Sequence, residues 1–81
     1  NIIKVGDVRI YPNPVNDILT LDQLQAGMSI IVSDLYGRII IKHVVTNKQE
    51  QFNTADWSPG TYFVQITDEK GDRYNQKVVK E

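Results

Sequence analysis

The segment SPGTYFVQI, residues 58–66, decides the fold of this chain. Its Ser-Pro-Gly opening is a turn signal, because Pro59 presets the backbone at the first central position of a turn and Gly60 accepts the positive φ that a type II turn needs next. From Tyr62 onwards, apolar side chains recur at every second position, which is the period of a half-buried β-strand. We therefore predict a turn followed by a strand that packs one face on a core.

The residues after this strand predict a hairpin. The segment DEKGD, residues 68–72, breaks the alternation, and Gly71 can take the left-handed position that a short hairpin loop needs. A second strand, from Arg73 to Lys80, then returns beside the first. The last third of the sequence is therefore a hairpin with a terminal strand.

The rest of the chain reads as further short strands. We expect them over residues 8–11, 18–21, 28–35, 38–45 and 50–53, each bounded by Pro, Gly, Asn or Asp. With the terminal hairpin this makes about seven short strands, with turn signals roughly every 8 to 12 residues, a spacing typical of an antiparallel β-sandwich. The predicted fold class is all-β.

Length, charge and cysteine content limit the function. A chain of 81 residues is one domain, and we expect residues 8–81 to form it, with residues 1–7 as a linker from a preceding domain. The sequence does not begin with Met, which suggests a fragment whose export signal would lie upstream. The formal net charge of −1 gives no electrostatic case for nucleic acid, and without cysteine there is neither a disulfide framework nor a zinc finger.

Residues for catalysis or metal binding are sparse. The single histidine, His43, falls inside a predicted strand, where we interpret it as a surface residue without a catalytic partner. The acids of the 68–72 loop lack the spacing of a Ca²⁺ site and are interpreted as turn formers. Asp17 and Asp34 lie near turns, where carboxylates accept backbone hydrogen bonds. We expect no enzyme activity, no metal and no cofactor.

The aromatic residues leave two alternatives open. Trp57 closes one end of a small core in the first interpretation, and stacks on a sugar or anchors a partner in the second. Tyr11 and Tyr36 read as residues at the edge of the core. An exposed pair of Trp57 and Tyr36 would make the chain a carbohydrate-binding or adhesion module, which is the main alternative function. A passive spacer is a further one.

Four segments resemble one known family. They are YPNP at 11–14 with the following Asp17, the turn DLYGR at 34–38, the PGTYFV stretch at 59–64, and Gly71 with the closing KVVK at 77–80. In this order they resemble the type A C-terminal sorting domain of the type IX secretion system, over residues 8–80. The departures are small: Trp57 stands where the family more often has Leu, and Glu81 adds an acid after the terminal lysine.

The resemblance implies a seven-stranded immunoglobulin-like sandwich and a sorting function. Domains of this family lie behind a cargo domain in the same chain, which reaches the periplasm through its own signal peptide. The type IX translocon and an outer-membrane shuttle protein then move the cargo to the cell surface or the medium, where a sortase-like cysteine peptidase commonly removes the domain. On this basis the family's structural positions are Tyr11, Pro12, Asn13, Pro14, Asp17, Asp34, Gly37 and Arg38. The positions expected to meet the translocon are Gly60, Tyr62, Val64, Gly71, Lys77, Val78, Val79 and Lys80.

The terminal strand carries the sharpest hypothesis. The segment 77–80 can be an ordinary edge strand on which lysines discourage pairing, or an exposed strand that a receptor captures by strand addition. We expect residues 62–66 to hold the hairpin on the core and residues 77–80 to present the recognition edge, while the sequence leaves open whether that edge is paired within the chain. Deleting residues 78–81 should then leave a folded domain that is not exported, and an excised domain could dimerise by strand exchange.

Overall fold

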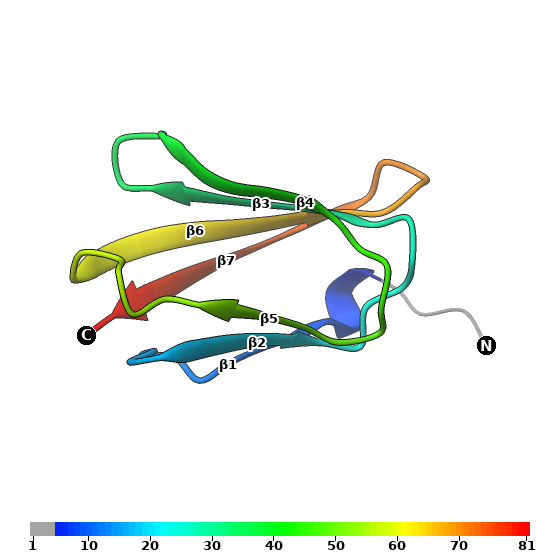
Figure 1. The fold of residues 1–81 in the computed structure, drawn as a ribbon. Coiled ribbons are helices and arrows are strands. Elements are labelled where there is room, and N and C mark those ends of the chain that lie inside the picture. The colour runs from blue at the N-terminus through cyan, green and yellow to red at the C-terminus, as the bar shows by residue number, and fades with distance from the viewer. Residues whose placement is uncertain (1–4) are drawn as a thin grey trace.

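The computed structural model describes residues 5–81. It contains one short 3-10 turn and seven strands, all shown in Figure 1. These elements are η1 (Val5–Asp7), β1 (Arg9–Tyr11), β2 (Ile18–Asp22), β3 (Ser29–Asp34), β4 (Ile39–Val44), β5 (Glu50–Asn53), β6 (Gly60–Thr67) and β7 (Arg73–Lys80).

The strands form two antiparallel sheets that face each other, as Figure 1 shows. The three-stranded sheet has the order β1-β2-β5, and the four-stranded sheet has the order β4-β3-β6-β7. The hairpins β3–β4 and β6–β7 stay within one sheet, whereas the chain passes between the sheets after β2, β4 and β5. The prediction of an all-β, immunoglobulin-like sandwich is confirmed.

The core lies between the sheets and follows from the period of two. In β3 the inward side chains of Ile30 and Val32 are fully buried, and they pair in register with Ile66 and Val64 of β6. The opposite sheet supplies Leu19 and Leu21 from β2. A small sandwich depends on such strictly alternating apolar positions, because one residue of register slip would turn each of them towards solvent.

The predicted strands were correct in number and placed within one residue at each end, except for the terminal hairpin. There β6 begins at Gly60, inside the predicted turn. Val8, Met28 and Val45 were predicted to belong to strands, but each lies one residue outside the observed strand. All three are nevertheless buried in the core. Hydrophobic pattern identified the buried residues more accurately than it identified where pairing stops.

The hairpin loop at 68–72 forms as predicted. Gly71 has a φ of +92°, in the left-handed region that favours glycine. The carboxylate oxygen Oδ1 of Asp68 accepts hydrogen bonds from the backbone amides of Lys70 and Asp72, both at 2.9 Å. The interpretation of this loop's first acid as a turn former is confirmed.

The two ends of the sandwich hold different parts of the chain. The N-terminal element η1 lies at the end to the right of Figure 1, and the C-terminus lies at the other end. The long axis of the domain measures 37 Å. Within residues 5–81, no helix has the length and apolar character needed to cross a membrane.

Candidate functional site

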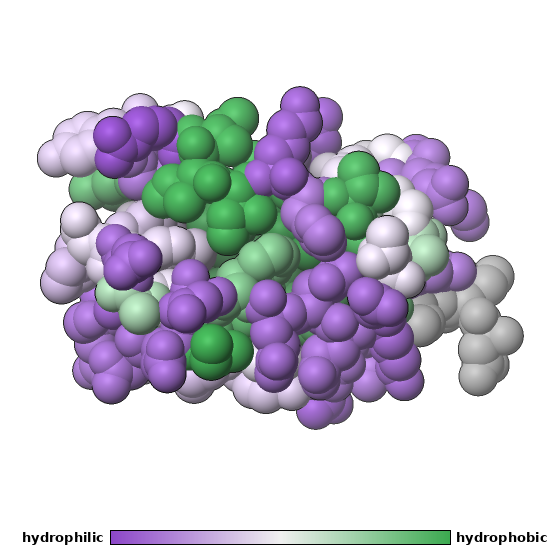
Figure 2. All heavy atoms as spheres, in the orientation of Figure 1, coloured by the Kyte–Doolittle hydropathy of each residue, from purple (hydrophilic) through white to green (hydrophobic). Residues whose placement is uncertain are grey.

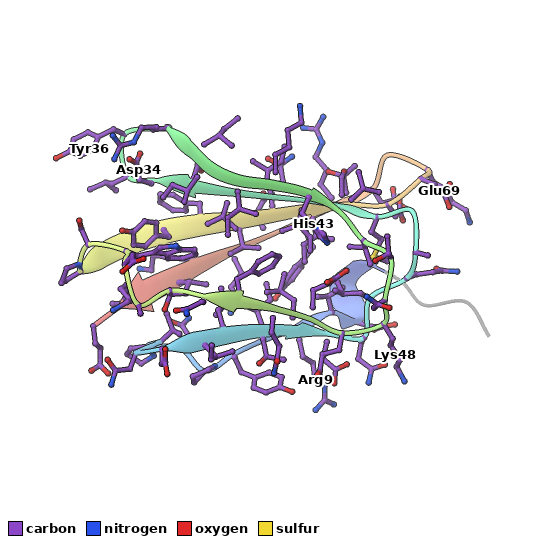
Figure 3. All side chains as sticks on the ribbon, viewed as in Figure 1. Arg9, Asp34, Tyr36, His43, Lys48 and Glu69 are labelled. Atoms are coloured by element: carbon purple, nitrogen blue, oxygen red, sulfur yellow. The ribbon has the colours of Figure 1, made fainter. Side chains whose placement is uncertain are left out.

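The motif segments gather at the end of the sandwich that holds the C-terminus, and Gly71 is the exception. Asp34 at the end of β3 pairs with Tyr62, and Gly60 pairs with Lys80. Val15, directly after the YPNP segment, forms a parallel bridge to Lys80. Figure 3 shows Asp34 and Tyr36 at this end. Segments distant in sequence are thus brought together around the last strand.

Asn13 is bound to the outer edge of β7 through its side chain. Its Nδ2 donates to the carbonyl of Lys77 at 2.9 Å, and its Oδ1 accepts from the amide of Val79 at 3.0 Å. An asparagine carboxamide can imitate a neighbouring peptide group in this way, since it offers one donor side and one acceptor side. The peptide bonds before Pro12 and Pro14 are both cis, the chain bends at Asn13 and Pro14, and neither proline has a backbone donor of its own.

Val15 continues this contact along the same edge. Its amide donates to the carbonyl of Val79 at 2.8 Å, and its carbonyl accepts from the amide of Glu81 at 2.9 Å. The side chain of Val15 is fully buried. We call the contact made by residues 13–15 on β7 the clasp.

The clasp covers the edge at residues 77–80 to which a receptor was expected to add a strand. The carbonyl of Lys77 and both backbone groups of Val79 are already bound within the chain, while β6 pairs with the other side of β7. Capture of this edge by strand addition therefore conflicts with the structure, because Asn13 and Val15, both far away in sequence, already bind it, and strand periodicity cannot detect such partners. The groups that a strand-exchange dimer would use at this edge are occupied in the same way.

Some of the residues expected to meet the translocon are buried, and others are accessible to solvent. Tyr62, Val64, Val78 and Lys80 are buried, since their positions alternate towards the core. Gly60, Gly71 and Lys77 are exposed, and Val79 is half-buried. Gly71 lies at the opposite end of the hairpin from Gly60.

Gly60 has the expected positive φ, but not in the expected turn. Its φ is +147°, whereas the second central residue of a type II turn has a φ near +80°. The residue is instead the first of β6, paired with Lys80. A side chain here would find open space, so backbone strain is the only objection to it.

Asp34 organises the β3–β4 turn. Its Oδ1 accepts the backbone amides of Tyr36 and Arg38 at 2.9 Å each, and its Oδ2 lies 3.0 Å from Nε of Arg38. Burial raises the pKa of this carboxyl, but these hydrogen bonds and the Arg38 charge outweigh it, so the pKa lies below its ordinary value of 3.8. Gly37 completes the turn with a φ of +84°.

Asp17 accepts hydrogen bonds near a turn, as predicted, but through its main-chain carbonyl and not through its carboxylate. The carboxylate is exposed, and it is the main-chain carbonyl that accepts hydrogen bonds, from the amide of Thr54 at 2.7 Å and from its hydroxyl at 2.6 Å. Thr54 is fully buried. This contact joins the start of β2 to the loop that carries Trp57.

Trp57 packs against the core, as its first interpretation predicted. Its ring centroid lies 4.8 Å from that of Tyr62, whose hydroxyl donates to the carbonyl of Ser58 at 2.6 Å. Tyr36, by contrast, is 92% exposed and Tyr11 is 44% exposed, so their assignment to the core edge was wrong. Tyr36 sits on a turn that projects beyond the paired strands, and sequence alone cannot show that projection.

His43 is not a simple surface residue. It is half-buried on the inward face of β4, and its Nε2 lies 3.1 Å from Oε2 of Glu50 on the facing sheet. The contact is an ion pair when His43 is protonated, not a well-aligned hydrogen bond. Its ring packs edge-on against Phe52 at 5.8 Å. The pair spans the two sheets near the crossing from β4 to β5.

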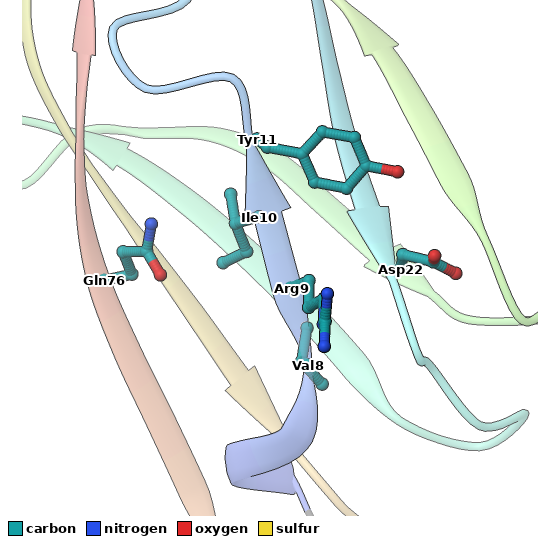
Figure 4. Close-up of a pocket in the computed structure, with 6 residues that line it drawn as sticks. All are labelled: Val8, Arg9, Ile10, Tyr11, Asp22 and Gln76. Carbon is teal, nitrogen blue, oxygen red and sulfur yellow. The ribbon is translucent and has the colours of Figure 1, made fainter.

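A shallow groove of about 570 Å³ runs between the edge strands β1 and β7. Figure 4 shows its lining, with Gln76 facing β1 from β7. The lining residues are Val8, Arg9, Ile10, Tyr11, Asp22 and Gln76. Its two charged side chains, Arg9 and Asp22, lie opposite each other in register. Within residues 5–81, no group of three or more acidic or histidine side chains is arranged to hold a metal ion.

Comparison with known proteins identifies the domain. A family model described as the secretion system C-terminal sorting domain matches residues 9–81. An endo-acting ulvan lyase of Formosa agariphila is 28% identical over 81 residues, which cover 98% of this chain and 16% of the lyase.

A solved structure has the same fold. PorZ, an essential bacterial surface component of the type IX secretion system of Porphyromonas gingivalis, superposes with a TM-score of 0.83 at 23% identity, over 94% of this chain and 12% of PorZ. The chain thus spans a small part of the proteins it matches. It belongs to the family of secretion system C-terminal sorting domains and has the role of a sorting signal for type IX export to the cell surface or beyond.

Proposed function

We propose that the type IX machinery reads this domain at its C-terminal end, which comprises the clasp, the β3–β4 turn and the start of β6. The observation that carries the proposal is the convergence of the family-like segments there, at the opposite end from η1. A receptor approaching this end meets the domain without colliding with a cargo attached before residue 8. A signal on folded cargo has to be accessible in this way.

The proposed recognition residues then take two roles. Lys77 is exposed and Val79 half-buried on the outer face of β7, so these side chains can touch a receptor directly. Tyr62, Val64, Val78 and Lys80 are buried and act by holding β6 and β7 in the shape that is read. We assign Gly60 to the start of β6 and Gly71 to the hairpin loop as shape-forming residues.

The proposed export route is the one that the family resemblance implies. We propose residues 1–7 as the linker and residues 8–81 as the sorting domain, with a longer cargo protein ahead of it. The cargo passes through the periplasm, an outer-membrane shuttle protein hands it on, and a sortase-like peptidase removes the domain outside. The domain itself has no catalytic role in this scheme. A sugar-binding role would need an open platform, and Trp57 packs on Tyr62 instead.

The proposal is tested by transplanting the domain. Residues 8–81 are fused to the C-terminus of a periplasmic reporter, in a bacterium with an intact type IX system and in a strain without the translocon. We expect the reporter at the surface or in the medium of the intact strain only. A folded fusion that stays in the periplasm of both strains would refute the proposal.

A further inference from the structure

Large apolar side chains gather on the surface around the β3–β4 turn. Tyr36 is 92% exposed, Leu35 62% and Ile39 57%. In Figure 2, green hydrophobic spheres lie over β4. Single exposed apolar residues are common in soluble proteins, but several within a few residues mark a binding surface. Type IX sorting residues expected from the sequence include none of these three.

Strand register extends this surface across the four-stranded sheet. Ser33 of β3 pairs with Phe63 of β6, and both side chains leave the outward face of the sheet. On its other side Ser33 pairs with the exposed Ile39, where the β3–β4 register shifts by one residue. Phe63 is 41% exposed. The serine between the two larger side chains is half-buried and small. We call Leu35, Tyr36, Ile39 and Phe63 the hairpin patch.

Hydrogen bonds close the turn that carries Leu35 and Tyr36. Asp34 accepts two amides and the Arg38 Nε, and the backbone adds bonds from Asp34 to the Arg38 carbonyl at 2.9 Å and from Gly37 to the Asp34 carbonyl at 3.0 Å. Tyr36 therefore projects from a fixed backbone. A side chain on a preorganised backbone loses less entropy when it binds, and tyrosine is among the residues enriched at interface centres.

The charged side chains on the outward face of the four-stranded sheet are basic. Arg38 has an 81% exposed side chain, and its Nε is already bound to Asp34. Lys77 lies beside Phe63 in register, and Lys42 lies one row away beside Ile31. Asp34 is the only acid between residues 28 and 44, and it is buried. A partner that fits this surface therefore has an apolar pocket with carboxylates at its rim.

We propose that the hairpin patch docks into such an acidic-rimmed apolar pocket on a protein of the export machinery. The inference rests on the proposed function, and it names a binding element different from the terminal strand. The patch lies at the same end as the clasp, so one receptor can contact both. Leu35 and Tyr36 are the anchors, and Lys77 contributes charge.

The test uses the reporter fusion in the strain with an intact type IX system. The double variant Leu35→Ser with Tyr36→Ser removes the anchors, and Lys77→Glu reverses the nearby charge. Val44→Ser is the matched control, because Val44 is 63% exposed, as Leu35 is, but lies at the other end of β4. We expect export of the double variant to fall about tenfold, and that of Lys77→Glu to fall less, while Val44→Ser is exported normally. Thermal unfolding of each fusion checks that the variants stay folded.

Each outcome bears on one claim. If the unaltered fusion is not exported, the proposed function fails and takes this inference with it. If the unaltered fusion and the double variant are exported equally, the sorting role stands and the hairpin patch is refuted. A photo-crosslinker at position 36 should in addition join the domain to a type IX component of the envelope.

Other occupants of the patch are excluded by two measurements on the purified fusion. Light scattering measures self-association, and sedimentation with phosphatidylglycerol vesicles measures membrane binding. Dimers or vesicle binding that the double variant abolishes would overturn the protein-pocket proposal. We expect a monomer that stays in the supernatant.

Discussion

The side-chain oxygen of Asn13 accepts a hydrogen bond from the backbone amide of Val79 at 3.0 Å, which joins residues 66 positions apart. A second bond from Asn13 to Lys77 makes the carboxamide a substitute for a neighbouring strand. The terminal strand of this sorting domain is therefore closed on both edges near its end.

Asn13→Ala should lower the free energy of unfolding by about 1–2 kcal/mol, because two hydrogen bonds to the main chain of β7 are lost at an exposed site. Chemical denaturation measures the change. Asn16→Ala, in the same loop and exposed, is the control and should be close to neutral. Asn13→Asp keeps an acceptor for Val79 but sets a carboxylate oxygen against the Lys77 carbonyl, so it should also destabilise. Equal stability of all four proteins would contradict the clasp.

Deleting residues 78–81 should unfold the domain or weaken it by roughly 3 kcal/mol or more, because Val78 is fully buried and the contacts with Val15 disappear. This replaces the sequence-based expectation of a folded truncation. Deleting Glu81 alone removes one backbone bond and should cost only about 1 kcal/mol. Thermal unfolding of both truncations distinguishes the two. A cooperative transition at the original temperature for the longer deletion would disprove the prediction.

Tyr62→Phe should destabilise the domain by about 1 kcal/mol, since the hydroxyl loses its bond to the Ser58 carbonyl. The ring contact with Trp57 remains, so the fluorescence of this single tryptophan should keep its emission maximum. Tyr62→Ala removes the ring and should shift the emission to the red. Tyr74→Phe, which loses a bond to Gln76, is the control and should leave the emission unchanged. An unshifted spectrum for Tyr62→Ala would argue against the contact between the rings of Trp57 and Tyr62.

Stability should fall on acidification through Glu50. Burial raises the pKa of its carboxyl, but the His43 side chain and the amide of Thr46 outweigh that effect, so the pKa lies below its ordinary value of 4.5. A carboxyl with a lowered folded-state pKa stabilises the fold above its unfolded pKa, and this contribution is lost as pH falls from about 4.5. Denaturation at a series of pH values should show a shallower acid loss in Glu50→Gln than in the unaltered domain. Identical slopes would mean that the lowered pKa of Glu50 contributes nothing to stability.

Gly60→Val should lower the free energy of unfolding by about 1 kcal/mol or more, because a β-branched residue is strained at a φ of +147°. There is open space around the new side chain, so the effect isolates the backbone. Gly6→Ala has open space as well but no positive φ, and it should be nearly neutral. If the two substitutions shift the melting temperature equally, strain at Gly60 is not the cause.

Much of the fold could be predicted because it depends on local rules. The period of two in β6 placed Tyr62, Val64 and Ile66 on the core, and turn chemistry placed the loops around Gly37 and Gly71. These features need only neighbouring residues. The family-like segments added the sorting role, which no single residue of the chain carries.

The rest depends on contacts between distant segments. Strand pattern marks residues 77–80 as an edge, but the bond from Asn13 that covers it has no local signal. An aromatic residue beside a turn reads as core, yet Tyr36 projects into solvent because Asp34 turns the backbone away from the sheets. Lys80 is buried because it lies two residues after Val78 in the same strand and so faces the same side. Its charge would instead predict an exposed side chain.

The clasp also ties the shape of the signal to complete synthesis of the domain. Val15 is translated well before its partners at Lys80 and Glu81. Synthesis runs from the N-terminus, so the sandwich cannot close until translation has passed residue 80. A protein whose translation stops before residue 80 therefore lacks the folded sorting signal, and only proteins translated through this domain present that signal to the export pathway.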